Sequence, residues 1–379
     1  MDTITDQHGQ AHFNGTDLVQ CLCLDWDPVH RLCLAGLTVI PIPDVDNITD
    51  IFQQVENHHA QLINGSSTQE MLIYRNTTAA HVSALTAHIH AVRTKGYVDH
   101  LDVLRSRTDD SDSIAALDTA RTQAHAKYLD ALTFLNDSDP GAALCATSKY
   151  HDAINRGKYP GLLTFFSDGL LFLKMSSLVA KSAQSSLHQA IIGWAAHMHL
   201  RLIYWGEATY QRVDQNHRPE QKQARFTLQP LLRGNETHFP TVVIEEGSNQ
   251  FILHREKDWW FRNWLPLDQP EGDVKIVVLI KVDRLAKSIT IELWDRHHPQ
   301  LASQTVTITP QLEESLSIDE PLDDSRWVVE GAPLVIPFER VFLRPPKQGQ
   351  GGETDFVMAE PAFITMAREC WQLDRMGVY

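Results

Sequence analysis

The pattern of apolar and polar positions predicts an α/β unit in the first 140 residues of the chain. Short apolar or alternating runs between turn residues are typical of strands. Longer segments with apolar positions three, four or seven apart are typical of helices. By these rules we expect strands at 18–24, 32–40 and 69–74, and helices at 46–63, 77–93 and about 114–135. The last helix ends at the polar run 136–140, which is our predicted domain boundary.

The second part of the chain has a different order of predicted elements. We expect a mixed helical segment at 160–174, a helix at 185–200, strands at 207–213, 223–228 and 241–246, a helix at 253–264, and a hairpin of strands 274–282 and 288–294. The order is therefore α-β-β-β-α-β-β, which is typical of an α/β (α+β) fold. A glycine-rich linker at 347–352 and an amphipathic helix at 360–375 follow.

These patterns predict three parts. The first is an N-terminal α/β accessory domain (1–140), the second a larger domain (141–346), and the third the linker with the C-terminal helix (347–379). A length of 379 residues is enough for two domains that each bury a core.

The composition indicates an ordinary globular protein, with 43% hydrophobic and 21% charged residues. No apolar run approaches the roughly 20 residues that span a bilayer, and the polar first ten residues do not resemble a signal peptide. Five cysteines, an odd number without paired spacing, favour reduced thiols. We therefore expect a cytoplasmic or nuclear protein with no membrane association, and we leave homo-oligomerisation open.

The negative charge is unevenly distributed along the chain. The net charge is −15, and residues 1–140 carry 8 Lys and Arg against 19 Asp and Glu, a balance of −11. Residues 178–300 carry 15 against 14, a balance of +1. Since nucleic acids are bound through clustered cations, the acidic part is suited to a protein partner, whereas the neutral part does not exclude nucleic acid.

Carboxylates gather where the most apolar predicted strand ends. Residues 241–244 are followed by Glu245, Glu246 and Gly247, and Glu220 begins the preceding predicted strand. Because side chains alternate along a strand, Glu245 and Gly247 share one face and Glu246 lies on the other. Only one of the two glutamates can therefore share a site with Glu220. Two carboxylates on neighbouring strand ends suit a hard divalent cation beside a phosphodiester.

The second part of the chain resembles the PD-(D/E)xK (restriction-endonuclease-like) superfamily, in particular a group of fungal proteins of that type. The resemblance covers roughly residues 160–345. The pieces that carry it are His188, the Arg-Pro-Glu at 218–220, and the segments 239–248, 258–260, 274–281, 289–294 and 333–338. It implies a restriction-endonuclease-like αβββαβ core, separate from the N-terminal accessory domain, and hydrolysis of nucleic-acid phosphodiester bonds with Mg²⁺ or Mn²⁺.

The resemblance also implies roles for particular residues. Glu220 and Glu245 would be metal ligands, and Glu246 would supply an extra oxygen ligand through its carbonyl. Glu220 stands where the superfamily has Asp, and Gly247 stands where it has the lysine that orients or activates water. We therefore name Lys257 and Lys281 as catalytic candidates that would replace this lysine from neighbouring elements. Either lysine could instead belong to a solvated surface.

Other readings of these residues stay open. His188 suits a polar core or helix start as well as catalysis, and the tryptophans 259, 260 and 264 suit core packing better than base stacking. Cys21, Cys23 and Cys33 with His30 provide a weaker zinc hypothesis. The main alternative function is a catalytically inactive nuclease-fold protein. It would act as a protein-interaction or regulatory module through the acidic N-terminal domain.

Overall fold

The computed structural model describes residues 39–41, 71–75, 98, 101–107, 111–138, 162–165, 171–174, 177–204, 208–213, 219–231, 239–261, 274–298, 302–311, 327–347 and 352–375. Several predicted features lie outside these residues. They are the strand at 18–24, the helices at 46–63 and 77–93, the cysteines and histidine of the zinc hypothesis, Trp264, and most of the glycine-rich linker.

A mixed seven-stranded sheet forms the centre of the fold, with the strand order β13-β12-β11-β10-β9-β8-β5. The pair β9 and β10 is parallel, and every other pair in this sheet is antiparallel. The strands are β5 (Leu202–Tyr204), β8 (Phe226–Pro230), β9 (Val242–Gly247), β10 (Ile276–Asp283), β11 (Ser288–Asp295), β12 (Gln304–Pro310) and β13 (Trp327–Glu330).

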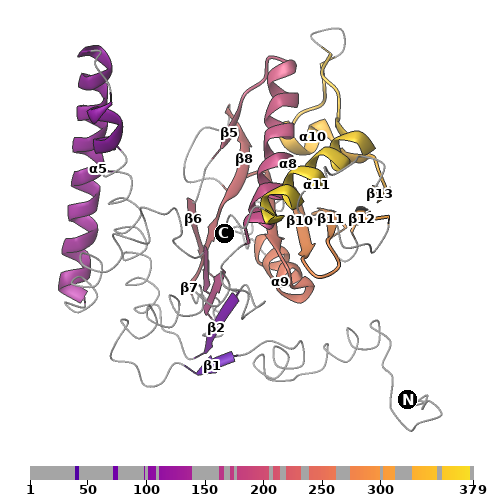
Figure 1. Ribbon diagram of the computed structural model, residues 1–379, viewed down its shortest axis with the longest axis horizontal. Helices are drawn as coiled ribbons and strands as arrows, with labels where there is room; N and C mark the ends of the chain where they lie inside the picture. Colours follow the sequence, from indigo (N-terminus) through magenta and orange to yellow (C-terminus); the bar gives the residue numbers. More distant parts are fainter. Residues whose placement is uncertain are drawn as a thin grey trace.

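Helices cover both faces of this sheet (Figure 1). The helices α8 (Leu178–His197) and α11 (Glu360–Arg375) pack on the face that carries Val242, Ile244 and Ile276, whereas α9 (Gln250–Phe261) packs on the face that carries Val243 and Val277. Because β9 and β10 are covered on both faces, their sequences are continuous apolar runs rather than alternating ones. The α10 helix (Phe338–Phe342) and the hairpin of β14 (Leu334–Ile336) with β15 (Phe356–Met358) adjoin the α8 side.

A second sheet of six strands has the order β1-β2-β4-β3-β7-β6. Its strands are β1 (Val39–Pro41), β2 (Met71–Arg75), β3 (Leu162–Phe165), β4 (Leu171–Lys174), β6 (Ala208–Val213) and β7 (Pro219–Ala224). Arg225 alone separates β7 from β8, so the chain passes directly from the second sheet into the central one. Strands from both sides of residue 140 pair in the second sheet. The predicted boundary at 136–140 therefore falls between strands of one sheet, and the domain limits themselves stay a prediction.

Several predicted elements are confirmed. The C-terminal helix has the predicted bounds 360–375, and the predicted hairpin of two long strands is formed by β10 and β11. The long N-terminal helix is α5 (Ser111–Ser138), which packs through Ala124 against Val98 and Leu101. The Ser177 side chain caps α8 by accepting a hydrogen bond from the Ala180 backbone N–H, and this helix begins seven residues earlier than predicted.

Two predictions were wrong. The described residues of the predicted helical segment 160–174 are not helical, since 162–165 form β3 and 171–174 form β4. The predicted strand 223–228 is the junction between β7 and β8 rather than one strand. In the part of the chain that the structure describes, no helix is long and apolar enough to cross a membrane.

Candidate functional site

The alternation predicted for the end of β9 is present, and it directs the two glutamates to opposite faces of the central sheet. Glu245 lies on the face covered by α9, where the Trp260 indole N–H donates a hydrogen bond of 2.7 Å to its Oε1. Glu246 follows Ile244 onto the face covered by α8. Both carboxylates are buried, with side chains 1% and 0% exposed.

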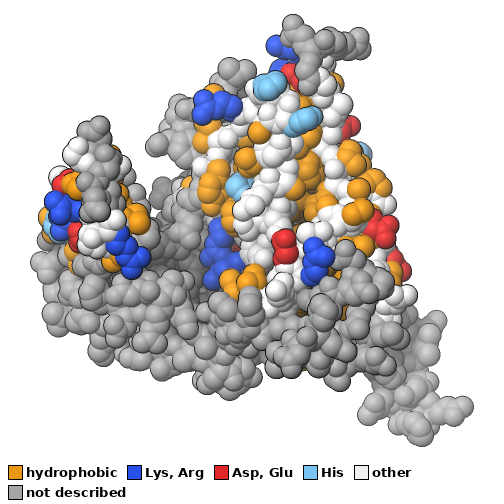
Figure 2. Space-filling model, turned by 45° about the horizontal axis from the view of Figure 1, so that its top comes forward, with side chains coloured by type: hydrophobic (Ala, Val, Ile, Leu, Met, Phe, Trp, Pro, Cys, Tyr) orange, Lys and Arg blue, Asp and Glu red, His pale blue; other side chains and the backbone are white. Residues whose placement is uncertain are grey.

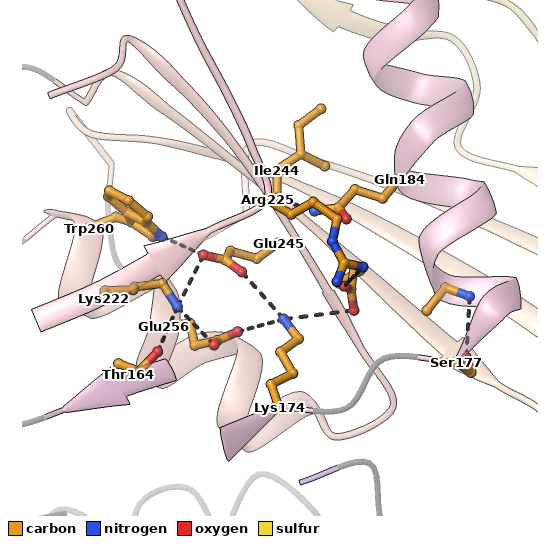
Figure 3. A network of polar contacts seen from close by, with 12 residues as sticks. Thr164, Lys174, Ser177, Gln184, Lys222, Arg225, Ile244, Glu245, Glu256 and Trp260 are labelled. Carbon is orange, nitrogen blue, oxygen red and sulfur yellow. Dashed lines mark hydrogen bonds and ion pairs between the residues drawn. The ribbon is translucent and has the colours of Figure 1, made fainter. Parts of the chain in front are cut away.

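Two lysines and a second glutamate complete a closed ring of ion pairs around Glu245 (Figure 3). The Lys222 ammonium lies 3.1 Å from Glu245 Oε1 and 2.8 Å from Glu256 Oε1. The Lys174 ammonium lies 3.3 Å from Glu245 Oε2 and 3.1 Å from Glu256 Oε2. Each carboxylate therefore gives one oxygen to each lysine. We call these four residues the ion-pair ring.

The ion-pair ring joins the two sheets of the molecule. Lys174 ends β4 and Lys222 lies in β7, both in the six-stranded sheet, whereas Glu245 lies in β9 and Glu256 on α9. Thr164, in the neighbouring β3, accepts a hydrogen bond of 3.1 Å from the Lys222 ammonium. The cations thus come from one sheet and the anions from the other sheet and its helix. The ring therefore fixes the position of one sheet against the other.

Burial makes the balance of charge in this ring important. The four side chains are between 1% and 4% exposed, and the ring contains two ammonium groups and two carboxylates. An isolated buried charge is strongly unfavourable, whereas buried charges that are paired and hydrogen-bonded are tolerated. The ring satisfies this condition because every carboxylate oxygen in it contacts an ammonium.

A smaller ionic group adjoins the ring on the α8 face. Arg225 Nη1 lies 3.8 Å from Glu246 Oε1, and Lys174 Nζ lies 3.8 Å from Glu246 Oε2. Gln184 of α8 donates a hydrogen bond from its side-chain amide to the backbone carbonyl of Ile244. Lys174 therefore contacts both glutamates of β9, because it crosses the end of the strand from one face to the other.

The pKa values follow from these contacts. Burial alone would lower the pKa of the Lys174 ammonium, but the carboxylates of Glu246, Glu256 and Glu245 raise it well above its ordinary value. Burial alone would raise the pKa of the Glu245 carboxyl, but Lys222, Lys174 and the Trp260 N–H hold it below its ordinary value. Both groups are therefore charged at neutral pH.

The predicted ligand Glu220 lies in β7, two residues before Lys222 on the same face of the strand, and it is buried. Its partner in the register of β6 is Arg212. Residues two apart on a strand are separated by roughly 6.6 Å. The β7 side chain that contacts Glu245 is that of Lys222.

The predicted catalytic lysines occupy two other places. Lys257 on α9 pairs with Asp258 at 3.1 Å, and its ammonium lies 3.8 Å from the centre of the Trp294 ring. Lys281 lies in β10, directly beside Gly247 of β9 in the parallel register. The face that Lys281 shares with Val277 and Leu279 is buried against α9. The Lys281 side chain itself is partly exposed, as in the alternative of a solvated lysine.

Gly247 lies beside one of the lysines that reach Glu245. A Cβ atom at this position would lie 3.9 Å from the Cε atom of Lys174 and 3.6 Å from a methyl carbon of Leu253, which are ordinary van der Waals contacts. The hydrocarbon stem of Lys174 thus passes over the glycine and brings its ammonium to Glu245. A lysine at position 247, where the superfamily has its catalytic lysine, would therefore meet the side chain of Lys174 from β4.

The remaining candidates belong to the core. Trp259 and Trp260 are buried with exposed fractions of 1% and 0%, which confirms the packing interpretation. His188 on α8 packs against Tyr204 and Phe226, with ring centres 4.6 and 4.8 Å away. Burial lowers the pKa of His188, so this side chain is a neutral member of an aromatic cluster at neutral pH.

The side chains around Glu245 do not fit a divalent cation in this arrangement. Mg²⁺ binds oxygen ligands at about 2.0–2.1 Å, and it would have to share the Glu245 oxygens with the ammonium groups of Lys222 and Lys174 at 3.1 and 3.3 Å. Three cationic centres would then surround one carboxylate. Among the described residues, no group of three His, Cys, Asp or Glu side chains is arranged to hold a metal ion.

Sequence reasoning missed most of the ion-pair ring. Lys174 was placed in a helical segment, and Lys222 lies in the polar run Gln-Lys-Gln, which is typical of an exposed strand. Glu256 stands between Arg255 and Lys257 on a helix, which is typical of a solvated surface. One signal was available, because carboxylates that are buried at the end of an apolar strand require cations to balance them. No family model matches this chain, and no curated protein matches it.

Proposed function

We propose that this chain is a nuclease-fold protein without catalysis at the predicted site, and that it acts as a protein-interaction or regulatory module. The observation that carries the proposal is the state of Glu245. Its oxygens are held by Lys222, Lys174 and Trp260 in a ring whose members are at most 4% exposed. Phosphodiester hydrolysis needs a water and a phosphate oxygen beside the metal ligand, and this buried, charge-balanced ring supplies a place for neither.

The order of elements supports the nuclease-fold part of this proposal. Helix α8 is followed by strands that end in β9, then by α9 and by β10, which is parallel to β9. This contains the αβββαβ order, with two additional strands between α8 and α9. In that case the nuclease-fold site would have kept the carboxylate of Glu245 and gained Lys222 and Lys174 as internal cations.

The distribution of charge supports the interaction part. Residues 1–140 have a balance of −11, whereas the segment around the ring is close to neutral. On the face shown in Figure 2, the Lys and Arg side chains of the described residues form small, separate groups among hydrophobic and acidic ones. Nucleic-acid binding draws on clustered cations, whereas an acidic region is complementary to a basic protein surface. A protein partner with a basic surface therefore fits better than nucleic acid.

The metal-dependent nuclease is the second candidate, and one observation favours it. The reaction requires a lysine near the metal-binding glutamate, and the structure brings two lysines to Glu245 although position 247 is glycine. In this reading, Glu245 with Glu220 would bind Mg²⁺ or Mn²⁺ once the ring had opened. Lys222 and Lys174, rather than Lys257 or Lys281, would be the lysines close to the reacting water.

Cleavage of labelled single-stranded and duplex DNA and RNA distinguishes the two candidates. The wild type and Glu245→Gln are each incubated with Mg²⁺, Mn²⁺ or EDTA. We expect no metal-dependent cleavage by either protein. Cleavage by the wild type that requires Mn²⁺ or Mg²⁺ and disappears in Glu245→Gln would refute the non-catalytic proposal.

The interaction half has its own test. Poly-lysine serves as a model of a basic surface and is titrated into the full chain by calorimetry at low and high salt. We expect saturable binding that weakens as salt rises, because exposed charges are screened. No binding at low salt would contradict the assignment of the acidic region to a basic partner.

A further inference from the structure

An exposed segment with two consecutive prolines follows helix α10. The helix ends at Phe342, its cap residue Leu343 has a left-handed backbone with φ of 57°, and the chain continues as Arg-Pro-Pro-Lys. We call residues 343–347 the proline segment. Pro345, Pro346 and Lys347 are exposed, and the exposed fraction of Leu343 is 39%. The segment therefore presents an apolar ridge that is followed by a cation.

The two prolines restrict the backbone of the proline segment to extended conformations. The proline ring fixes φ near −65°, and a residue that precedes a proline avoids the helical region. The second restriction acts on Arg344, and both restrictions act on Pro345. Residues 345–347 accordingly have no helical or strand structure. These restrictions favour the polyproline II helix, which has no internal hydrogen bonds.

A clasp of hydrogen bonds holds the base of the proline segment. The two terminal guanidinium nitrogens of Arg344 donate hydrogen bonds of 2.7 Å to the two carboxylate oxygens of Glu353. The backbone N–H of Lys347 donates one of 2.6 Å to Glu353 Oε2. Glu353 thus joins the two residues that flank the prolines. A bidentate pair of arginine and carboxylate fixes orientation as well as distance.

The clasp is itself attached to the core of the molecule. The Arg344 guanidinium lies 4.9 Å from the ring centre of Phe338, which is buried. On the other side of Glu353, the Trp194 indole N–H of α8 donates a hydrogen bond of 3.2 Å to the Thr354 carbonyl. The hydrogen bonds from Arg344 and from a backbone N–H lower the pKa of the Glu353 carboxyl to about 2. The clasp is therefore charged at neutral pH, and the segment is held in place before any partner binds.

From these contacts we propose that the proline segment is a docking site for a protein domain that binds polyproline II helices. Domains of this kind receive prolines in a groove lined with aromatic rings, and a carboxylate beside the groove would pair with Lys347. Because the segment is preorganised, less conformational freedom is lost on binding. The inference rests on the proposed interaction function. It adds a second surface, whose partner has an acidic rather than a basic border.

The test measures binding of the full chain to an array of purified SH3, WW and EVH1 domains by biolayer interferometry. We expect saturable binding of the wild type to at least one domain. Pro345→Ala/Pro346→Ala should weaken this binding at least about 10-fold, because the prolines would be its central contacts. Both prolines are exposed, so the double variant should keep the Tm of the wild type. The matched control is Pro361→Ala, a change at an exposed proline in the first turn of α11, which should bind like the wild type.

Two single variants test the clasp and the charge. Glu353→Gln keeps both prolines but weakens the pair with Arg344. It should bind about 3- to 10-fold more weakly, because preorganisation is lost without the loss of a contact. Lys347→Glu should also weaken binding, because it places a carboxylate against the acidic border. Equal affinity of Glu353→Gln and the wild type would overturn the role of the clasp.

The outcomes separate this inference from the proposed function. No saturable binding to any domain, or equal binding by the double proline variant, would overturn the docking site and leave the absence of catalysis standing. Metal-dependent cleavage by the wild type would overturn the proposed function and leave the binding result unaffected. Dimers of the wild type that the double proline variant does not form, measured by sedimentation, would assign the segment to a second copy of this chain and overturn the proposal.

Discussion

The sharpest stability prediction concerns Glu256, whose carboxylate contacts both lysines of the ion-pair ring. Glu256→Gln keeps the shape of the side chain but removes one of the ring's two negative charges. Lys222 at 2.8 Å and Lys174 at 3.1 Å then share Glu245, and the buried ring has an excess positive charge. Breaking a buried pair by removal of one partner costs about 3–5 kcal/mol. The folding equilibrium constant should therefore fall about 10²- to 10⁴-fold.

Urea denaturation followed by tryptophan fluorescence measures this change, because Trp260 contacts the ring. The matched control is Glu360→Gln, a change of the same kind at an exposed position in the first turn of α11. It should lie within about 0.5 kcal/mol of the wild type. A loss below about 1 kcal/mol for Glu256→Gln would refute the reasoning.

A double variant tests the same reasoning through charge balance. Lys222→Met/Glu256→Gln leaves one lysine and one glutamate, so the ring is neutral again. The two single losses should therefore not add, and the double variant should be more stable than their sum predicts by about 1–3 kcal/mol. Additive losses would show that the two side chains act separately and that the ring is not one unit.

Three further predictions concern titration and reactivity. Because the pKa of the Glu245 carboxyl is lowered in the folded state, its charge stabilises the fold above pH 4.5, and this contribution is lost as pH falls through the lower folded pKa. The free energy of unfolding of Glu245→Gln should therefore fall less steeply than that of the wild type below about pH 4.5. Burial lowers the pKa of His188, which favours protonation of the unfolded state below pH 6.5. His188→Phe should therefore lose less stability than the wild type as pH falls below 6.5. Burial raises the pKa of the Cys370 thiol to about 12, so mass spectrometry should find it unmodified by iodoacetamide in the native protein and alkylated in urea; native alkylation would contradict its burial.

The elements that the sequence predicted well have a local cause. Helix α11 shows a clear amphipathic period, and β10 and β11 are long strands rich in Ile and Val, which favour strands. The predicted helical segment 160–174 was wrong because its short apolar runs, Leu-Leu-Thr-Phe and Leu-Phe-Leu-Lys, fit a buried helix as well as two strands. Each run has four residues, and Gly161 and Gly169 precede them, which favours strands.

The site was predicted only in part, for a physical reason. The alternation in β9 correctly directed Glu245 and Glu246 to opposite faces, since strand geometry is local. The contacts of the ion-pair ring are not local. Lys174 lies 71 residues from Glu245 in the sequence and 82 residues from Glu256. The sequence therefore indicated that carboxylates gather at this strand end. It did not indicate whether a metal ion or lysines from the other sheet would balance their charge.

The most direct test of the central claim is a crystal structure of the wild type grown with Mn²⁺, with anomalous scattering recorded to locate the metal. The account predicts Lys222 and Lys174 on the carboxylates of Glu245 and Glu256, with no anomalous peak between them. A Mn²⁺ peak on Glu245 with the two ammonium groups displaced would contradict the account and restore the metal-dependent nuclease as the leading function.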